Sequence, residues 1–271
     1  MQTLATVVIV ALLAGCATGI GALPTLATAS VSHRVYDGAI GLAAGIMVGA
    51  AVFALIVPGL ELGTPWEVVA GLLVGGAFML VANALLPHLH LLFRGERLEG
   101  TVAVDETALP DRVVPAGEDE GSALRRALLV GSAVTIHNVP EGLAVGIAFA
   151  SGEAGLGFAI ATAIAVQNVP DGFAMAVPSV RAGVSKPKTV LYTTLSGGVP
   201  EPIAAAAGFA LVAVVTGLFP VAAGFAAGAM IAVVFRELVP SSHGHGYADT
   251  ATATFVCGFA IMLVVDTVLA V

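Results

Sequence analysis

The chain has 271 residues, of which 58% are hydrophobic and only 10% are charged, against about 45–50% and about 25% in an ordinary soluble domain. Its mean hydropathy is +1.01. A soluble globule of this size cannot bury so much apolar surface, so the composition excludes a cytosolic enzyme, a nucleic-acid-binding protein and a disordered chain. The net charge of −8 says little by itself, because much of the acid lies in one segment. The composition indicates a polytopic membrane protein.

Eight apolar runs are long enough to cross a bilayer as helices, since a span needs about 20 mostly apolar residues. A transmembrane barrel would instead show alternating segments of about 10 residues. In chain order, the predicted spans are residues 4–26, 38–58, 67–89, 124–150, 156–178, 189–213, 219–239 and 250–270. We therefore expect an all-α fold in which residues 1–271 form a single transmembrane domain.

The basic residues predict the orientation of these spans. With eight spans, all ten Lys and Arg residues fall on one side of the membrane, and the positive-inside rule makes that side cytoplasmic. Both termini are therefore expected outside the cell, in a multi-pass protein of the plasma membrane. The connection 94–123 carries eight acidic residues and few large apolar ones, which predicts a flexible acidic loop on the cytoplasmic side.

Two copies of one polar pattern occur within the fourth and fifth spans. His-Asn-Val-Pro-Glu-Gly occupies residues 137–142, and Gln-Asn-Val-Pro-Asp-Gly occupies residues 167–172. An ionised side chain at the bilayer centre costs about 2.5–3.5 kcal/mol on insertion scales, so each one requires a partner or a water-filled cavity. At 1.5 Å per residue, His137 and Gln167 lie ~20 and ~18 Å from the outer ends of antiparallel spans. The two hexamers are therefore predicted to lie almost level with each other.

Each hexamer places two candidate metal ligands on one helical face, because its first and fifth positions are i and i+4 neighbours. His137 can face the same point as Glu141, and Gln167 the same point as Asp171. The proline of each hexamer cannot donate a backbone hydrogen bond. We expect it to interrupt the helix and expose carbonyl oxygens, as at the ion sites of many transporters. Imidazole, carboxylate and amide ligands suit Zn²⁺, Fe²⁺, Mn²⁺ or Co²⁺ better than Cu(I).

Other spans supply further candidates. Glu201 lies ~18 Å from the cytoplasmic end of the sixth span, and Met47 lies ~14 Å from that end of the second. The simpler interpretations are that Met47 packs, that intramembrane amides bond between helices, and that Glu141 and Asp171 relay protons without metal. Further polar residues lie near the two membrane surfaces. Glu61 and Asp266 are candidates for attracting cations at an outer entrance, and Glu237, His243 and His245 are candidates for lining an inner exit.

The two hexamers resemble the signature of the ZIP (ZRT/IRT-like) family of divalent metal transporters, and the chain is most similar in pattern to its prokaryotic, GufA-type branch. The similarity extends through GLAAGIMVGAAVF at 41–53, SGGVPEP at 196–202 and AGAMIAVVFRELVPSSHGHG at 227–246. The resemblance implies eight helices, external termini and a binuclear metal centre between the fourth and fifth helices. It also implies that the metal is moved into the cytoplasm and that the protein is often dimeric.

Carried over to this chain, the resemblance implies two groups of metal ligands. The first metal would be lined by His137, Glu141, Gln167 and Asp171, with Met47 nearby. The second would be lined by Asn138, Asn168 and Glu201, which share Glu141 and Asp171 with the first.

This sequence also departs from the family pattern. Asn168 stands where related prokaryotic members can have an aspartate, and Asp171 replaces the commoner glutamate. Arg236 precedes Glu237, where a cation beside a metal exit is unfavourable. The first difference would weaken the negative charge of the second site, and the third is unfavourable for an exit beside Glu237. The acidic loop lacks the histidines typical of many relatives, so histidine-based metal sensing there is doubtful as well.

The resulting hypothesis is a transporter of divalent transition-metal ions and not an enzyme. Zn²⁺ is the first candidate, followed by Fe²⁺, Mn²⁺ and Cd²⁺; the metal is the substrate, and no prosthetic group is expected. The partners would be the lipid bilayer and a second copy of the chain. Two alternatives remain open. An intramembrane metallo-hydrolase would need an activated water and a general base, and the chain has no HExxH motif. An ion-coupled carrier of an organic solute would not need His137 beside Glu141.

Overall fold

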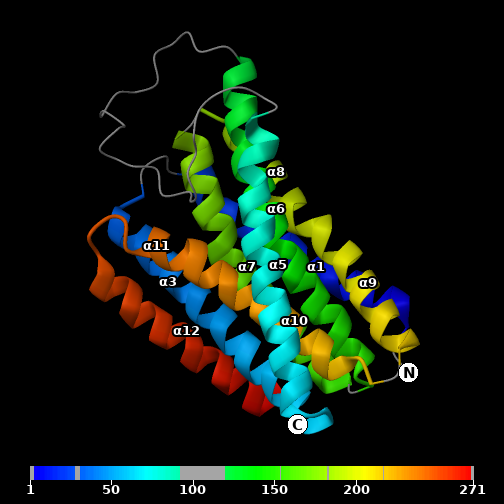
Figure 1. Ribbon diagram of the computed structural model, residues 1–271. Helices are drawn as coiled ribbons and strands as arrows, with labels where there is room; N and C mark the ends of the chain where they lie inside the picture. The colour runs from blue at the N-terminus through cyan, green and yellow to red at the C-terminus, as the bar shows by residue number, and fades with distance from the viewer. Residues whose placement is uncertain are drawn as a thin grey trace.

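The computed structural model describes residues 3–27, 31–91, 120–152, 154–181, 183–215 and 217–269, which form helices and no strand. The predicted all-α fold is confirmed. The helices pack as long rods, shown in Figure 1. In chain order they are α1 (Leu4–Ala22), α2 (Pro24–Ala27), α3 (His33–Gly49), the π-helix η1 (Ala50–Ile56), α4 (Val57–Leu62), α5 (Pro65–Leu91), α6 (Glu120–Ala150), α7 (Ala154–Arg181), α8 (Lys186–Gly198), α9 (Pro200–Val214), α10 (Phe219–Val233), the π-helix η3 (Val234–Leu238), α11 (Val239–Ser242) and α12 (Ala248–Leu269).

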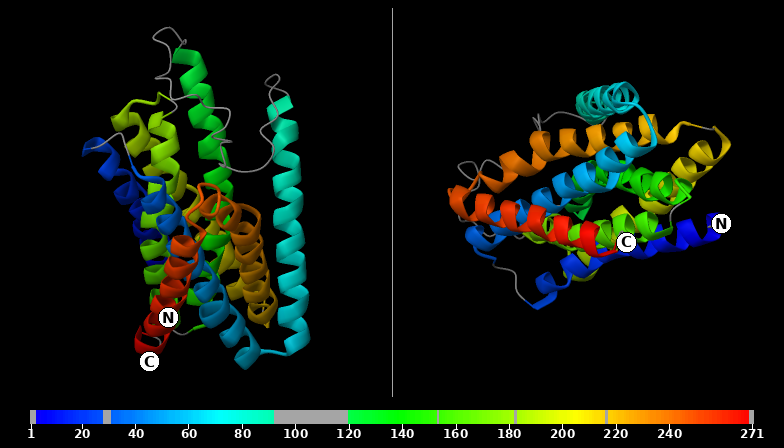
Figure 2. Two further views of the ribbon diagram at one scale, coloured as in Figure 1. Left: turned by 90° about the vertical axis from the view of Figure 1, so that its left-hand side faces the viewer. Right: turned by 90° about the horizontal axis from the view of Figure 1, so that it is seen from below.

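Each predicted span corresponds to a rod made of one helix or of consecutive helices. Among the described residues, seven rods are long and apolar enough to cross a membrane, and α6, with 31 residues, runs beside them. Helix α1 begins and α12 ends at the same end of the bundle (Figures 1 and 2), as an even number of crossings requires. Helix α6 begins at Glu120, inside the segment predicted as a loop; residues 94–119 of that segment lie outside the described residues.

Glycines allow the rods to pack in close pairs. Helix α1 lies against α7, α3 against α12, α5 against α10 and α6 against α9; Figure 2 shows α5 and α10 side by side at one edge of the bundle. A Cβ on Gly172 would lie 1.8 Å from the carbonyl oxygen of Thr18, and one on Gly142 would lie 2.3 Å from that of Glu201. Small residues at such contacts are typical of helices that associate in lipid. The last residue of each hexamer therefore sets how closely its helix packs.

The two prolines of the hexamers do not interrupt their helices, so this part of the prediction is wrong. Helices α6 and α7 continue through Pro140 and Pro170. A single proline removes one backbone hydrogen bond, and packing against neighbouring helices keeps the flanking turns helical. The sixth rod does break, at Val199 between α8 and α9. Pro200 begins α9 and so places Glu201 in its first turn.

π-helical turns distort two other rods that carry candidate residues. Pro240 has no N–H, and its ring would clash with the carbonyl oxygen four residues earlier in a regular α-helix. The preceding turn widens instead, and the N–H of Val239 donates to the carbonyl oxygen of Val234, five residues back. The wider turn contains Glu237. The rod of α3 and α4 has the same arrangement in η1, just after Met47. Such turns occur frequently at functional sites.

Candidate metal centre

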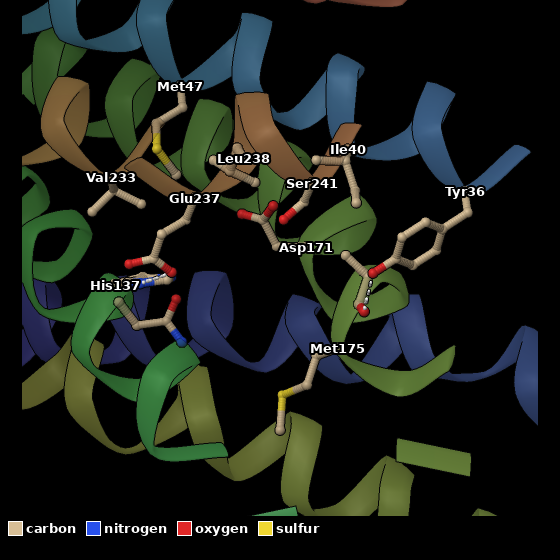
Figure 3. Close-up of a pocket in the computed structure, with 12 residues that line it drawn as sticks. Tyr36, Ile40, Met47, His137, Asp171, Met175, Val233, Glu237, Leu238 and Ser241 are labelled. Carbon is tan, nitrogen blue, oxygen red and sulfur yellow. Dashed lines mark hydrogen bonds and ion pairs between the residues drawn. The ribbon is translucent and has the colours of Figure 1, made fainter. Parts of the chain in front are cut away.

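Half of the predicted metal ligands line one pocket inside the bundle. Met47 of α3, His137 and Asn138 of α6 and Asp171 of α7 share this pocket with Glu237 of η3 (Figure 3). Met47 and Asn138 are buried, whereas His137 and Asp171 are half-buried. The second, fourth, fifth and seventh predicted spans thus each supply a polar or sulfur-bearing side chain to the same space. The level placement predicted for the two hexamers agrees with this geometry.

His137 pairs with a carboxylate that the sequence placed only near the inner surface. Its Nε2 lies 2.6 Å from Oε2 of Glu237, and the amide nitrogen of Asn83 in α5 donates to the other oxygen of Glu237 at 3.0 Å. Glu237 is therefore a direct neighbour of a predicted metal ligand. Asn83 was missed altogether, although a lone amide within an apolar span is itself a signal of an interhelical bond or a polar site.

The remaining predicted ligands lie deeper and are almost fully buried: Glu141, Gln167, Asn168 and Glu201. The amide nitrogen of Asn168 donates to Oε1 of Glu201 at 2.8 Å and to the carbonyl oxygen of Ala14 at 2.9 Å. The side chains of Glu141 and Gln167 lie close enough to interact, but within the described structure their polar atoms, and Oε2 of Glu201, have no partner at full hydrogen-bond geometry. Buried polar atoms are nearly always paired, and buried charges are paired or coordinate metals. These oxygens therefore suit a cation.

Three carboxylates belong to this region. Glu141 lies close enough to both Glu201 and Asp171 for their charges to act on each other, and Glu201 likewise interacts with Asp171. Bringing like charges together in the interior is costly unless a cation balances them. Among the described residues, no three His, Cys, Asp or Glu side chains converge as a ready coordination shell. The structure gathers the donors into one region, with His137 facing Glu237 and Asn168 facing Glu201.

Residues 110–266 match the family described as "ZIP Zinc transporter". The chain belongs to the ZIP family. It is similar to "Zinc transporter GufA" of Myxococcus xanthus, at 35% identity over 95% of this chain and 96% of the relative. It is also similar to "Zinc transporter ZIPB" of Bordetella bronchiseptica, at 35% identity over 93% and 78%, and to human "Zinc transporter ZIP11", at 33% identity over 92% and 93%. The predicted membership is confirmed.

Family membership answers the broad question of function. A ZIP protein is a polytopic membrane transporter of metal ions, so this chain is a transporter and not an enzyme. The metal is accordingly a substrate and not a prosthetic group. The alternative of an intramembrane metallo-hydrolase is therefore wrong, as is that of a carrier for an organic solute.

Arg236, which departs from the ZIP pattern, and Asn138, which follows it, both have a structural context. Arg236 is exposed, whereas the side chain of Glu237 is only 16% exposed and turns into the pocket, so the adjacent cation lies apart from His137. Asn138, predicted as a ligand of the second metal, donates its amide nitrogen to the carbonyl oxygen of Ser196 at 2.7 Å. This bond fixes its side chain between α6 and α8.

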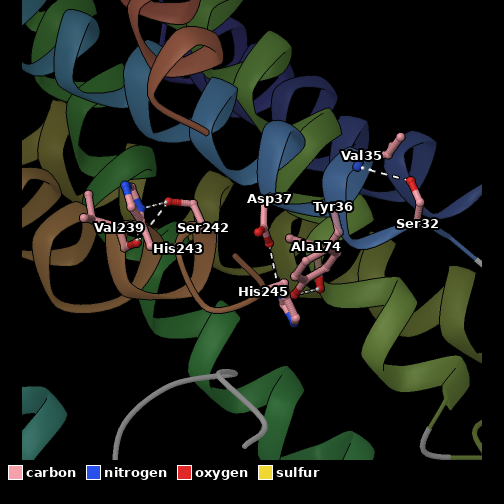
Figure 4. A network of polar contacts seen from close by, with 9 residues as sticks. All are labelled: Ser32, Val35, Tyr36, Asp37, Ala174, Val239, Ser242, His243 and His245. Carbon is pink, nitrogen blue, oxygen red and sulfur yellow. Dashed lines mark hydrogen bonds and ion pairs between the residues drawn. The ribbon is translucent and has the colours of Figure 1, made fainter. Parts of the chain in front are cut away.

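The candidates at the two ends of this ZIP bundle differ in their surroundings. Asp266 on α12 lies close enough to Glu61 on α4 to interact with its charge. At the opposite end, His243 is exposed, and its Nδ1 lies 2.9 Å from Oγ of Ser242 within the turn that ends α11 (Figure 4). His245 is less exposed and lies 2.6 Å from a buried aspartate of α3. The two histidines therefore occupy different environments, although they are only two residues apart.

Proposed function

We propose that this ZIP protein carries Zn²⁺ into the cytoplasm through a binuclear site between α6 and α7. The observation that carries the proposal is the buried cluster of carboxylate and amide oxygens without hydrogen-bond partners. The cluster lies beside a pocket that holds an imidazole and a thioether. Mixed nitrogen and oxygen ligands suit Zn²⁺ among divalent metals. The relatives named zinc transporters support the choice of metal.

The first metal would be held at the pocket. His137 supplies an imidazole nitrogen, Asp171 and Glu141 supply carboxylate oxygens, and Gln167 supplies an amide oxygen. Met47 lies in the same pocket as His137 and Asp171 and would add a soft, weak contact. These ligands are of mixed type and only some of them are charged, which suits a site that an ion must both enter and leave.

The second metal would lie deeper, beside Glu201. Asn168 already contacts Glu201, and Glu141 and Asp171 lie within electrostatic reach of it. The two shared carboxylates would bridge the metals and offset their mutual repulsion. Asn138 contributes through its amide oxygen, because its nitrogen is bonded to α8.

The charged residues at the two ends of the bundle indicate the direction in which the metal ion would travel. The carboxylates of Glu61 and Asp266 would attract cations at an outer entrance, at the end where α1 begins and α12 ends. The opposite helix ends carry Arg34, Arg181 and Lys186, which supports a cytoplasmic location there. We place the protein in the plasma membrane with both termini outside, as a homodimer.

The ion pair between His137 and Glu237 supplies a step in release. An ion held by His137 would displace Glu237, because the pair uses the same imidazole nitrogen at 2.6 Å. When Glu237 returns, it competes for that nitrogen and also offers the ion a carboxylate on the exit side. The ion then leaves toward the end of α11 and the start of α3, where His243 and His245 lie.

Uptake into proteoliposomes tests this proposal. Purified protein is reconstituted, external Zn²⁺ is added, and an internal zinc-sensitive dye records the initial rate. We expect His137→Ala and Glu141→Ala to abolish uptake, because each removes a first-metal ligand. Glu67→Ala is the matched control, since Glu67 is a half-buried carboxylate at the start of α5 that bonds only to Thr64 in the described structure. Unchanged uptake in both site variants would reject the assigned centre.

Metal content tests the binuclear part separately. Equilibrium dialysis should give two Zn²⁺ per wild-type chain at saturation and one in Glu201→Ala, because Glu201 belongs to the second site alone. Anomalous scattering from metal-soaked crystals should give two peaks between α6 and α7. A single peak with full uptake would retain the transporter and remove the second site.

A further inference from the structure

The carboxylate of Glu237 is held at both of its oxygens. The amide nitrogen of Asn83 in α5 donates to Oε1 of Glu237 at 3.0 Å, whereas Oε2 of Glu237 lies 2.6 Å from Nε2 of His137. The described residues that line the pocket come from other helices than α5 (Figure 3). Asn83 therefore reaches the pocket only through the carboxylate that it contacts.

Helix packing fixes Asn83 beside η3. Asn83 follows Gly75 and Met79 along α5 at steps of four residues, which places the three near one face of the helix. Met79 is fully buried, and a Cβ on Gly75 would lie 1.9 Å from the carbonyl oxygen of Phe225 in α10. Because the two backbones touch about two turns before Asn83, α5 holds this side chain at a fixed place beside Glu237.

The chemistry of an amide suits this position. The nitrogen of Asn83 can donate to a carboxylate, and because the amide is neutral it orients Glu237 without cancelling the charge that attracts His137 or an ion. A lysine would neutralise that charge, and an aspartate would repel it. The other amide atom of Asn83, Oδ1, is buried without a hydrogen-bond partner among the described atoms. Such an atom costs stability, as is typical of residues that serve a functional site.

Holding one oxygen of Glu237 also affects how readily the other oxygen meets His137. A free glutamate side chain loses rotamer freedom when it is fixed in one geometry. A side chain that is already anchored has less freedom to lose, so its contact with a partner is stronger. The bond from Asn83 therefore strengthens the pairing of Glu237 with the imidazole.

We propose that Asn83 is a positioning residue that holds Glu237 against His137. Its consequence for transport rests on the release step proposed above, in which Glu237 competes with the ion for Nε2 of His137. Without the bond from Asn83, a mobile Glu237 competes less well, so the ion binds more tightly and leaves more slowly. The maximal uptake rate and the KM for Zn²⁺ should then fall together.

Zn²⁺ uptake by Asn83→Leu in proteoliposomes measures this consequence, because leucine is similar in size to asparagine and cannot donate. We expect the maximal rate and the KM each to fall about 3- to 10-fold, which is what one hydrogen bond of ordinary net strength supplies. A partly misfolded protein would lose rate at unchanged KM. Asn83→Gln keeps an amide donor and should recover part of both values. Val81→Ala is the matched control, because Val81 is exposed on the same helix.

A double-mutant cycle shows whether Asn83 acts through Glu237. If it does, adding Asn83→Leu to Glu237→Ala should change the uptake kinetics no further than Glu237→Ala alone. Effects that multiply in the double variant would mean that Asn83 acts independently of Glu237, and they would overturn the proposal.

The reactivity of His137 in metal-free protein separates this proposal from the proposed function. Diethylpyrocarbonate modifies accessible imidazoles, and mass spectrometry reads each histidine separately; the side chain of His137 is 15% exposed. We expect His137 to be modified several-fold faster in Asn83→Leu than in wild type, at an unchanged rate for the exposed His243. Equal rates for His137 would overturn the proposal. Faster modification with wild-type uptake kinetics would support the positioning role and refute release by Glu237, which belongs to the proposed function.

Discussion

Replacing Gly172 by alanine tests the link between helix packing and the metal centre. The new Cβ would lie 1.8 Å from the carbonyl oxygen of Thr18, whereas real Cβ atoms essentially never approach within 3.0 Å, so α1 and α7 must separate locally by the difference of about 1.2 Å. Overpacking of this kind costs about 1–3 kcal/mol. The same movement would stretch the bond of Asn168 to Ala14, 2.9 Å long, which is worth about 0.5–1.5 kcal/mol. We expect a total loss of about 2–4 kcal/mol.

Thermal unfolding in detergent measures this loss, and proteoliposome uptake measures its effect on the site. At about 2–4 °C per kcal/mol, Tm should fall by about 5–15 °C, with slower Zn²⁺ uptake. Gly76→Ala is the matched control, because its Cβ would lie 3.6 Å from the carbonyl oxygen of Gly228, which is an ordinary contact. Its Tm should stay level or rise slightly, since alanine favours helix. If Gly172→Ala unfolds at the wild-type temperature, the close contact and its role in positioning Asn168 are refuted.

Three further predictions concern the centre and its two ends. Asn168→Asp adds a carboxylate to the buried cluster, so it should lower Tm without metal and enlarge the Tm rise with excess Zn²⁺; a wild-type Zn²⁺ response would argue against the second site. Glu237→Gln removes the charge that pairs with His137, so initial uptake should slow several-fold while dialysis shows unchanged Zn²⁺ content; an unaltered rate would exclude Glu237 from release. Glu61→Gln combined with Asp266→Asn should slow uptake at low salt and match wild type near 1 M ionic strength, where charges are screened beyond about 3 Å; a salt-independent defect would contradict electrostatic attraction.

Much of the centre could be predicted from the order of residues alone. A spanning helix must satisfy its own backbone in lipid, so its position and direction follow from an apolar run. With the rise per residue known, the depth of each polar residue follows too. This is why His137, Asn138 and Asp171 were expected close together, and they line one pocket. Met47, from the second span, was expected at a similar depth and lines that pocket as well.

The errors arose where one helix crosses another. Depth along a single helix placed Glu237 near the inner surface, but the packed α10 rod brings it against His137. Asn83 attracted no attention, because its partner lies 154 residues away in the chain. The pairing of Asp37 with His245 joins residues 208 apart. Local spacing carries no information about such contacts, since they depend on which rods are neighbours and how they are rotated.

The backbone at the prolines was likewise decided by contacts between helices and not by local sequence. The proline rule predicted an interrupted helix at Pro140, where the helix continues, and did not predict the π-helical turn before Pro240. Because a proline lacks an N–H, the turn before it can adopt several backbone conformations of similar energy. Contacts with neighbouring helices select one of these conformations. Composition and spacing thus determined the all-helical membrane fold and the level at which the candidate metal ligands gather, because the bilayer constrains each helix separately, and the resemblance of the motifs indicated the family. Only the tertiary structure decided which donors face each other, because that depends on close glycine contacts between helices distant in the chain.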